Sequence, residues 1–383
     1  MKKFDLIVVG GGALGTFHAL HALQRGLSVA LIERHQTPES ATVRNFGQIV
    51  PSGMNSKWQR MGRRSLEIYQ DLQAQTDISA RKNGTVYLAS NAEEQTLLEE
   101  LAVINQAEGY ASHLLTKQQC LSKYEGLRAD YCVGGLFFPN EITLEPRVAI
   151  GRVLGYLTEQ RGLHYLPNQT AVAIEENAHG CSVTTARNTQ LEAAKVLIFS
   201  GSEFKILYPA IFENSDIVAV KLQMILTAPQ PKQRFDGSIL TGLSIRRYEA
   251  FGACPSYASI KQREDPNSFA KRWGVHILFK QALDGSVIVG DTHEYAPAAQ
   301  ADSLGFDNRQ EMNTFMLTEA QQIFQLQNWD IQQVWNGVYC QCKTTDIFQH
   351  NVSENVHIVT GIGGKGMTGS PGFAEQHIKT LFA

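Results

Sequence analysis

The stretches Phe4-Asp-Leu-Ile-Val-Val-Gly-Gly-Gly-Ala-Leu-Gly-Thr16 and Val29-Ala-Leu-Ile-Glu33 decide the fold of the N-terminal part of the chain. The apolar run over residues 6–9 predicts a buried parallel strand, and the apolar residues after the glycines recur at helical spacing. The three glycines of a G-x-G-x-x-G motif are Gly10, Gly12 and Gly15. A second apolar strand ends in an acid about twenty residues further on. The pattern therefore predicts a β-α-β unit that binds an adenine dinucleotide.

Each residue type in this unit has a physical role. Gly10 allows a tight turn, Gly12 lets the backbone approach a pyrophosphate, and Gly15 lets the helix pack on the strand. The unpaired N–H groups and the positive dipole end of the helix N-terminus favour the phosphates. Glu33 is expected to accept hydrogen bonds from both ribose hydroxyls of the adenosine. The same dinucleotide site is expected to include Ala13, Leu14 and Arg34.

Composition limits the classes of partner. The chain has 383 residues, of which 43% are hydrophobic and 19% charged, as in a globular protein with a sizeable core. A net charge of −3 and a pI near 6.4 argue against nucleic acid or an anionic membrane as partner. No apolar run is long enough to span a bilayer, and the first strand begins too early for a signal peptide. The six cysteines lack zinc-ligand spacing, so we expect a reducing, cytoplasmic setting and no metal site.

The rest of the chain alternates between segments with an α/β pattern and segments with an antiparallel-strand pattern. Helices are predicted over 61–73, 92–107, 145–159, 311–325 and 372–381. Strands are predicted over 84–89, 134–138, 171–174, 182–185, 195–199, 218–226, 273–280, 287–289 and 356–360. Residues 284–285 are a hairpin turn signal. Longer strands with antiparallel alternation fill 217–290. We therefore predict an α/β, Rossmann-like nucleotide domain built from residues 1–83, 140–215 and 335–383. An α+β substrate domain with an antiparallel sheet takes 84–139 and 216–334.

A second glycine cluster, Thr360-Gly-Ile-Gly-Gly-Lys-Gly-Met-Thr368, helps to decide whether the bound dinucleotide is FAD or NAD. One dinucleotide needs one pyrophosphate cradle. A second helix N-terminus is explained as a stabiliser of negative charge on the N1–C2=O edge of a reduced flavin. The alternative is a plain tight turn with glycine caps. The cluster favours FAD.

Several short motifs resemble the FAD-dependent amine oxidases of the D-amino-acid oxidase, glycine oxidase and sarcosine oxidase superfamily. These motifs are Gly10–Gly15, Glu33, residues 42–48, 84–89 and 145–147, Ser200-Gly201, Gly290-Asp-Thr-His293 and Gly361–Met367. More narrowly, Val43-Arg-Asn-Phe-Gly47 and Gly290-Asp-Thr-His-Glu-Tyr295 resemble a branch associated with phosphonate catabolism. The proposed role of that branch is oxidative removal of an amine from aminophosphonates.

The resemblance implies a set of non-covalent FAD contacts. They are Thr42, Asn45, Phe46, Gly47 and Gln48 along the flavin, Val172 on the adenine side, Ser200 and Gly201 near the pyrophosphate or ribose, and Gly363, Gly364, Lys365, Gly366 and Met367 at the pyrimidine edge. Lys365 is the cation expected beside N1–C2=O, or the charge that helps oxygen accept electrons. The alternative for Lys365 is a solvated lysine at a helix start.

The resemblance also implies the reaction. A hydride passes from the carbon bearing the amine to flavin N5, the imine hydrolyses, and oxygen or another acceptor reoxidises the flavin. Oxygen as the acceptor gives hydrogen peroxide. The protein mainly orients a neutral amine, so no acid–base triad is expected, although Gln48 is placed beside the ring.

The substrate is expected to differ from a simple α-amino acid. Relatives place a carboxylate-binding Arg after a Trp-x-Gly segment, which here reads Trp335-Asn-Gly-Val-Tyr-Cys-Gln-Cys-Lys343. Tyr339 takes about that position, and a slip of two residues would bring Gln341 or Lys343 there instead. The candidate donors to an anionic group such as a phosphonate are His276, His293, Tyr339 and Lys343. His276 is expected on one strand and His293 at the end of the next, with a structural histidine as the alternative for each.

Other interpretations remain open at this point. Some sarcosine oxidases attach FAD covalently through a cysteine in this segment, but Cys340 and Cys342 are expected to stay unmodified. A generic glycine or D-amino-acid oxidase is the nearest alternative function. A non-catalytic FAD-binding or tRNA-modification partner would need a basic surface that the composition does not provide. An NAD-dependent dehydrogenase is disfavoured by the second glycine cluster.

Overall fold

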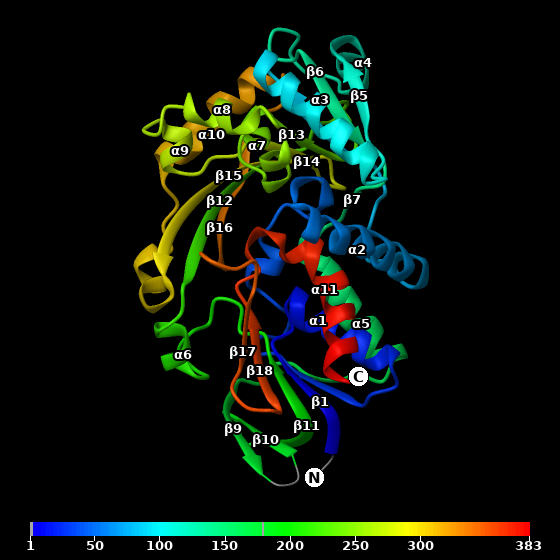
Figure 1. Cartoon of the computed structure of the whole chain (residues 1–383), viewed down its shortest axis with the longest axis vertical. Helices are drawn as coiled ribbons and strands as arrows, with labels where there is room; N and C mark the ends of the chain where they lie inside the picture. Colours follow the sequence, from blue (N-terminus) through cyan, green and yellow to red (C-terminus); the bar gives the residue numbers. More distant parts are fainter. Residues whose placement is uncertain (1–2, 178–179) are drawn as a thin grey trace.

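The chain forms two large sheets that lie end to end (Figure 1). The computed structural model describes residues 3–177 and 180–383. The first sheet has the order β17-β18-β11-β1-β2-β8, with β10 and β9 attached beside β11. Its strands are β1 (Lys3–Val9), β2 (Val29–Ile32), β8 (His164–Leu166), β9 (Ala171–Asn177), β10 (Gly180–Thr185), β11 (Gln190–Ile198), β17 (Phe348–Asn351) and β18 (Val356–Thr360). The central strands are parallel, as in a Rossmann-like domain.

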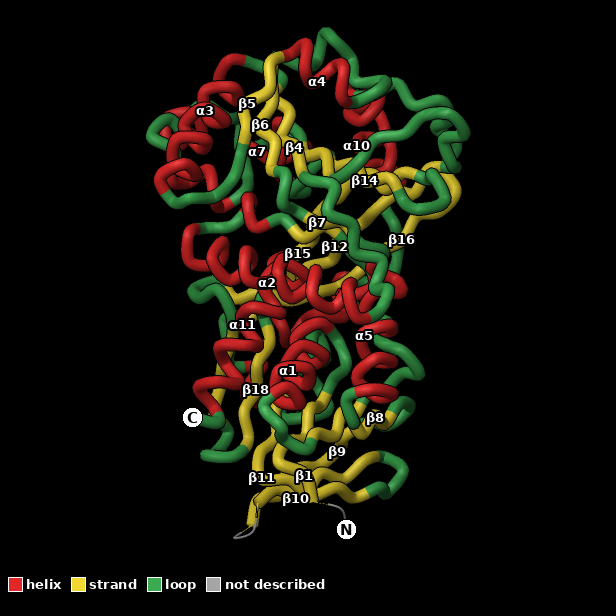
Figure 2. Tube along the Cα trace, turned by 90° about the vertical axis from the view of Figure 1, so that its right-hand side faces the viewer, coloured by secondary structure: helices red, strands yellow, loops and turns green. Residues whose placement is uncertain are grey.

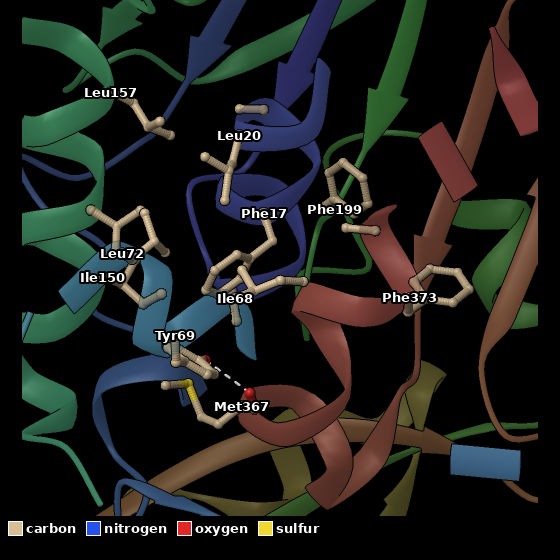
Figure 3. Packing of buried hydrophobic residues seen from close by; sticks show 14 of the residues in the cluster. Phe17, Leu20, Ile68, Tyr69, Leu72, Ile150, Leu157, Phe199, Met367 and Phe373 are labelled. Carbon is tan, nitrogen blue, oxygen red and sulfur yellow. Dashed lines mark hydrogen bonds between the residues drawn. The ribbon is translucent and has the colours of Figure 1, made fainter. Parts of the chain in front are cut away.

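Four helices cover one face of this sheet (Figure 2). They are α1 (Ala13–Gln24), α2 (Ser56–Gln75), α5 (Pro146–Gln160) and α11 (Gly366–Leu381). Figure 3 shows Phe17 of α1, Tyr69 of α2 and Ile150 of α5 in one apolar cluster. The Tyr69 hydroxyl donates to the Met367 carbonyl at 2.8 Å, which ties α2 to the start of α11. This buried bond fixes the helix that begins in the second glycine cluster.

The second sheet is antiparallel except at one pair of strands. Its order is β16-β12-β15-β14-β13-β4-β6-β5, and β13 and β4 are the parallel pair. Its strands are β4 (Thr85–Ala89), β5 (His113–Thr116), β6 (Gly134–Phe138), β12 (Ile217–Thr227), β13 (Ser238–Leu240), β14 (Leu278–Gln281), β15 (Val287–Pro297) and β16 (Ile331–Cys342). A short pair, β3 (Gln48–Ile49) and β7 (Ile142–Thr143), lies apart from both sheets.

Other helices accompany the second sheet and the connections. They are α3 (Ala92–Ala107), α4 (Lys117–Lys123), α6 (Pro209–Glu213), α7 (Gly242–Ile245), α8 (Tyr257–Gln262), α9 (Phe269–Arg272) and α10 (Gln310–Ile323), with 3-10 turns η1 (Ala41–Val43), η2 (Pro51–Gly53), η3 (Glu249–Ala253), η4 (Ala298–Leu304) and η5 (Gly363–Lys365). This arrangement confirms the predicted fold class of a Rossmann-like α/β part and an antiparallel-sheet part.

The structure differs from the expected strands in the region of the two histidines. Gly274 adopts a φ of +51° in the turn that follows α9. The strand predicted over 273–280 begins only at Leu278, because the pairing of β14 with β13 and β15 starts there. His276 therefore precedes β14. The strand predicted over 287–289 continues to Pro297, because β15 pairs with β12 along its length through a bulge. His293 lies within β15 and not at its end.

Two other boundaries shift as well. Helix α2 begins at Ser56, where the Asn55 side chain accepts a bond from the Trp58 N–H at 3.1 Å. Helix α11 begins at Gly366, directly after the glycine turn. The predicted domain boundary between 334 and 335 falls inside β16, which pairs with β12 of the second sheet. The other predicted boundaries lie in connections: residues 83/84 before β4, 139/140 between β6 and β7, and 215/216 before β12.

The buried carboxyl of Glu141 makes protein stability depend on pH. It accepts bonds from the Tyr110 hydroxyl at 2.6 Å and the Ser52 N–H at 2.8 Å, yet burial raises its pKa from 4.5 to about 7. The folded pKa exceeds the unfolded one, so the folded state holds the proton more tightly. The contribution of Glu141 to the free energy of unfolding is therefore largest below about pH 4.5 and falls as the pH rises to about 7.

We predict that Glu141→Gln removes this loss of stability. Relative to the natural protein, the free energy of unfolding should rise by up to about 3 kcal/mol at about pH 8 and change least at low pH. Urea unfolding of both proteins with excess FAD at several pH values measures this difference in the free energy of unfolding. Glu159→Gln, an exposed carboxyl near the end of α5, is the matched control and should leave the pH profile unchanged. A Glu141→Gln profile parallel to that of the natural protein would contradict the prediction.

Candidate functional site

One large cavity opens at the carboxyl edge of the first sheet. It has a volume of about 950 Å³, within the size range of cofactor pockets. Four parallel strands reach it with their last residues, which are Val9, Ile32, Ile198 and Thr360. Side chains of the second sheet line its other wall. In open α/β sheets, ligands bind at this edge.

The first glycine-rich turn forms a backbone cradle beside the cavity. Gly10 has a φ of +104°, and a Cβ there would lie 2.3 Å from the Phe199 carbonyl oxygen. A Cβ on Gly15 would lie 1.9 Å from the Gly10 oxygen, so neither position accepts a side chain. Gly12 caps α1, and the Ala13 N–H donates to Thr42 Oγ1 at 3.0 Å. The N-terminus of α1 is thereby presented to the cavity, as phosphate binding requires.

The Glu33 carboxyl is fixed at the end of β2. Oε2 accepts a bond from the Gly11 N–H at 2.8 Å, and Oε1 accepts one from the His35 N–H at 2.9 Å. A carboxylate oxygen can accept more than one hydrogen bond, and Glu33 lines the cavity, so its two oxygens remain potential acceptors for two vicinal hydroxyls. The neighbouring Arg34 pairs with Glu203 at 3.1 Å and also lines the cavity.

Most residues expected to contact the cofactor meet at this cavity. Its lining includes Gly10, Gly12, Ala13, Leu14, Gly15, Glu33, Arg34, Thr42, Asn45, Phe46, Gln48, Ser200, Gly201, Gly363, Gly364, Lys365, Gly366 and Met367. Gly47 and Val172 are not among the lining residues. Gly47 turns with a φ of +72° against the Leu144 carbonyl, and Val172 follows the lining residue Ala171 with its side chain largely toward solvent.

Among residues 3–177 and 180–383, four residues that line the cavity have a buried polar side-chain atom without a hydrogen-bond partner. These atoms are Gln48 Nε2, Ser200 Oγ, His276 Nδ1 and Ser370 Oγ. An unpaired buried polar atom costs about 1–3 kcal/mol, so such atoms in a cavity wall indicate that a polar ligand supplies the partners. The lining residues thus fit FAD, and Gln48 and Ser200 are among those with a polar side-chain atom that lacks a protein partner.

The second glycine cluster faces the same cavity as the first. Gly361 and Gly363 have φ values of +67° and +69°, and α11 starts three residues after Gly363. Lys365 lines the cavity with a side chain that is 17% exposed, and its Nζ pairs with Glu249 Oε1 at 2.9 Å. Lys365 is therefore an ion-paired lysine in the cavity wall and not a solvated one.

Of the four residues expected at the substrate end of the cavity, three lie close together: His276, His293 and Tyr339. The rings of His276 and His293 are 5.6 Å apart, and those of His293 and Tyr339 are 6.3 Å apart. Burial, reinforced by Arg247, lowers the pKa of both imidazoles well below the ordinary value, so both are neutral. Burial raises the pKa of Tyr339, which keeps its hydroxyl a donor. Lys343 lines the cavity too, but its side chain is exposed.

Sequence reasoning missed two charged residues of this wall, Arg247 and Asp291. Arg247 follows α7, and its guanidinium donates to the Tyr295 hydroxyl at 3.0 Å and to the Gly274 carbonyl. Burial raises the pKa of Asp291 to about 7. The tandem Arg246-Arg247 was a weak signal, because it lies far from the Trp335 segment in sequence. Asp291 stood within a quoted motif, but only its histidine was singled out.

The two cysteines near the flavin position are free thiols within this cavity wall. Cys340 Sγ lies 3.1 Å from the Gly201 carbonyl oxygen and 3.3 Å from Thr360 Oγ1. Burial raises the pKa of Cys340 to about 11, and it also raises that of Cys342. Covalent attachment through sulfur uses the thiolate, which both environments disfavour.

The fold and the cavity together define an oxidoreductase that binds a flavin dinucleotide across a Rossmann-like edge. A family model described as "DAO: FAD dependent oxidoreductase" matches residues 5–378. The chain belongs to this family, and FAD is its cofactor. No helix among residues 3–177 and 180–383 is long and apolar enough to cross a membrane.

Known proteins resemble the chain to different extents. Human mitochondrial sarcosine dehydrogenase is 27% identical over 148 residues, which cover 37% of this chain and 16% of that protein. Glycine oxidase from Bacillus licheniformis is 24% identical over 212 residues, 52% of this chain and 54% of that protein. The chain thus matches only part of each. The crystal structure of glycine oxidase from Geobacillus kaustophilus superposes with a TM-score of 0.77 at 16% identity, covering 100% of this chain and 95% of that one.

We predict that Glu33→Ala weakens FAD binding at least about tenfold, because a charged acceptor for two ribose hydroxyls is lost. Titration of the apoprotein with FAD, followed by flavin fluorescence, measures the dissociation constant. Glu175→Ala, an exposed acid on β9, is the control and should bind FAD normally. Unchanged affinity in Glu33→Ala would show that the ribose lies elsewhere.

A further prediction concerns the bond between the protein and its cofactor. Acid precipitation should release all FAD and leave a colourless pellet, because Cys340 and Cys342 are protonated thiols. Mass spectrometry of the peptide that contains both cysteines provides the measurement. A flavin mass on that peptide would contradict non-covalent binding.

Proposed function

We propose that the chain is an FAD-dependent amine oxidase or dehydrogenase that oxidises a C–N bond of a small anionic amine. The proposed substrate class is an aminophosphonate related to 2-aminoethylphosphonate. The observation that supports this choice is the wall of the cavity formed by Arg247, His276, His293 and Tyr339. It offers one guanidinium and several neutral donors, whereas the segment after Trp335 lacks the Arg expected for a simple carboxylate.

The charge balance of this wall suits an anionic group. Burying an unpaired anion costs several kcal/mol, and a phosphonate carries more charge than a carboxylate. Arg247 supplies a full positive charge, while Tyr339 supplies an O–H donor and neutral His276 an N–H donor without adding repulsion. The single N–H of neutral His293 is already bonded to the Gly274 carbonyl. Arg247 is already oriented by Tyr295 and by the Gly274 carbonyl, so its geometry is set before the substrate arrives.

The remaining proposed roles concern the cofactor side of the cavity. FAD supplies the hydride acceptor when it is bound. Gln48 Nε2 is a free donor beside the ring position, and Lys365 with the N-terminus of α11 places positive potential at one side of the cavity. Oxygen or another acceptor then takes the electrons. Lys343, on the exposed rim, is proposed as a further donor to the anionic end of the substrate.

A generic glycine or D-amino-acid oxidase is the second candidate. The match to glycine oxidase in both sequence and structure favours it. The two candidates differ at the anionic end of the substrate. A carboxylate is bound best by one planar guanidinium that donates two parallel hydrogen bonds, whereas a phosphonate accepts hydrogen bonds from donors in several directions.

We predict that 2-aminoethylphosphonate, or an N-methylated or hydroxylated relative, is oxidised with a higher kcat/KM than glycine, sarcosine or D-alanine. Arg247→Met should raise the KM for the phosphonate at least about tenfold, because the buried anion loses its charged partner. His276→Ala and His293→Ala should raise KM more than they lower kcat. Steady-state assays of flavin reduction or oxygen uptake provide these constants.

The control for these variants is Arg263→Met, an exposed arginine that pairs with Glu93, and it should leave the constants unchanged. Oxidation of glycine as efficiently as every aminophosphonate tested would return the chain to the second candidate.

A further inference from the structure

Three potential metal ligands meet in the cavity wall at His276, Asp291 and His293. One nitrogen of each imidazole and one carboxylate oxygen lie within 4.8 Å of one another. Imidazole and carboxylate are the ligands that suit divalent first-row transition metals, and two histidines with one carboxylate leave coordination positions open. The cluster thus has the ligand number and chemistry of an open metal site.

Backbone pairing positions these ligands. The segment before β14 runs beside β15, where the His276 N–H donates to the Asp291 carbonyl at 2.8 Å and the His293 N–H donates to the Trp273 carbonyl at 2.6 Å. All three side chains line the cavity. Asp291 and His293 thus lie on β15, and backbone hydrogen bonds hold the segment with His276 against that strand. Sites built on regular elements are held more precisely than sites on loops.

The hydrogen bonds of the two histidines leave their ligating atoms free. His293 Nδ1 bonds the Gly274 carbonyl at 2.8 Å, so that nitrogen carries the proton and Nε2 keeps its lone pair. His276 is 4% exposed, and its Nδ1 has no partner. No hydrogen bond from another side chain reaches the Asp291 carboxyl among residues 3–177 and 180–383. A carbonyl-oriented histidine and an unpartnered buried nitrogen are what a metal ion would explain.

We propose that His276, Asp291 and His293 bind a divalent first-row transition metal ion whose open position faces the cavity and takes an oxygen of an anionic ligand. The two histidines then reach the anion through the ion and not through their own N–H groups. Both imidazoles are in the neutral form that ligation requires.

The other groups facing the cluster set its charge. They are Arg247, Tyr248, Tyr295 and Tyr339. Arg247 opposes a cation, and Asp291 offsets that charge. An anionic ligand between Arg247 and the metal would be held from both sides, which is a common arrangement for phosphate-like groups.

Metal content of the holoenzyme tests this proposal. The protein, prepared without a histidine tag, is stripped with a chelator, equilibrated by dialysis against Zn²⁺, and assayed for bound zinc by mass spectrometry. We expect one ion per chain. His276→Ala, Asp291→Asn and His293→Ala should each weaken binding at least about tenfold. His350→Ala, an exposed histidine on β17, is the control and should bind zinc normally. The absorbance of bound FAD confirms that each variant is folded.

Co²⁺ gives a second measurement that needs no variant. Coordination by His276, Asp291 and His293 should produce visible d–d bands beyond the flavin absorption, and added methylphosphonate should shift them. No stoichiometric Zn²⁺ or Co²⁺ in the natural protein, or equal binding in all three ligand variants, would overturn the metal site. If added methylphosphonate leaves the Co²⁺ d–d bands unchanged, the proposed anion-binding role of the metal is wrong. No amine is present, so these outcomes are independent of the proposed substrate.

Discussion

The tight backbone contacts around the first glycine-rich turn are the constraint on which the rest of the structure depends. Gly10 touches the Phe199 carbonyl and Gly15 touches Gly10, at distances that no Cβ permits. These contacts let β1, α1 and the end of β11 meet closely. They bring the N-terminus of α1 to the carboxyl edge of the sheet, where its free N–H groups face the cavity. The position of every other cavity wall is set relative to this edge.

The cavity joins two walls of different chemistry. The first-sheet wall is dominated by backbone, with the starts of α1 and α11 and the carboxyl of Glu33. The second-sheet wall is dominated by side chains, among them Arg247, His276 and Tyr339. A site formed by backbone atoms keeps its shape when most side chains change. The chemistry of the second-sheet wall, in contrast, changes with a single substitution. A shared fold therefore leaves the chemistry of the second wall open, and the glycine oxidase structure with a TM-score of 0.77 is only 16% identical in sequence.

Sequence patterns predicted the elements whose signals are local. Helix α3 has the predicted bounds, because Asn91 caps it and its apolar residues recur at helical spacing. Strand β18 also has the predicted bounds. The predicted start of β14 was wrong, because its pairing with β13 and β15 begins only at Leu278, after a turn at Gly274 with a positive φ. Apolar alternation does not reveal such a turn.

The sequence by itself determined the dinucleotide cradle and the flavin-type second glycine turn. Each of these depends on residues close together in the chain, whose spacing is dictated by backbone geometry. Only the tertiary structure decided that Arg247 and Asp291 join His276 and His293 at one wall. Asp291 and His293 share β15, whereas Arg247 follows α7 and His276 precedes β14. Side chains from these separate segments meet through strand pairing and packing, which no local pattern encodes.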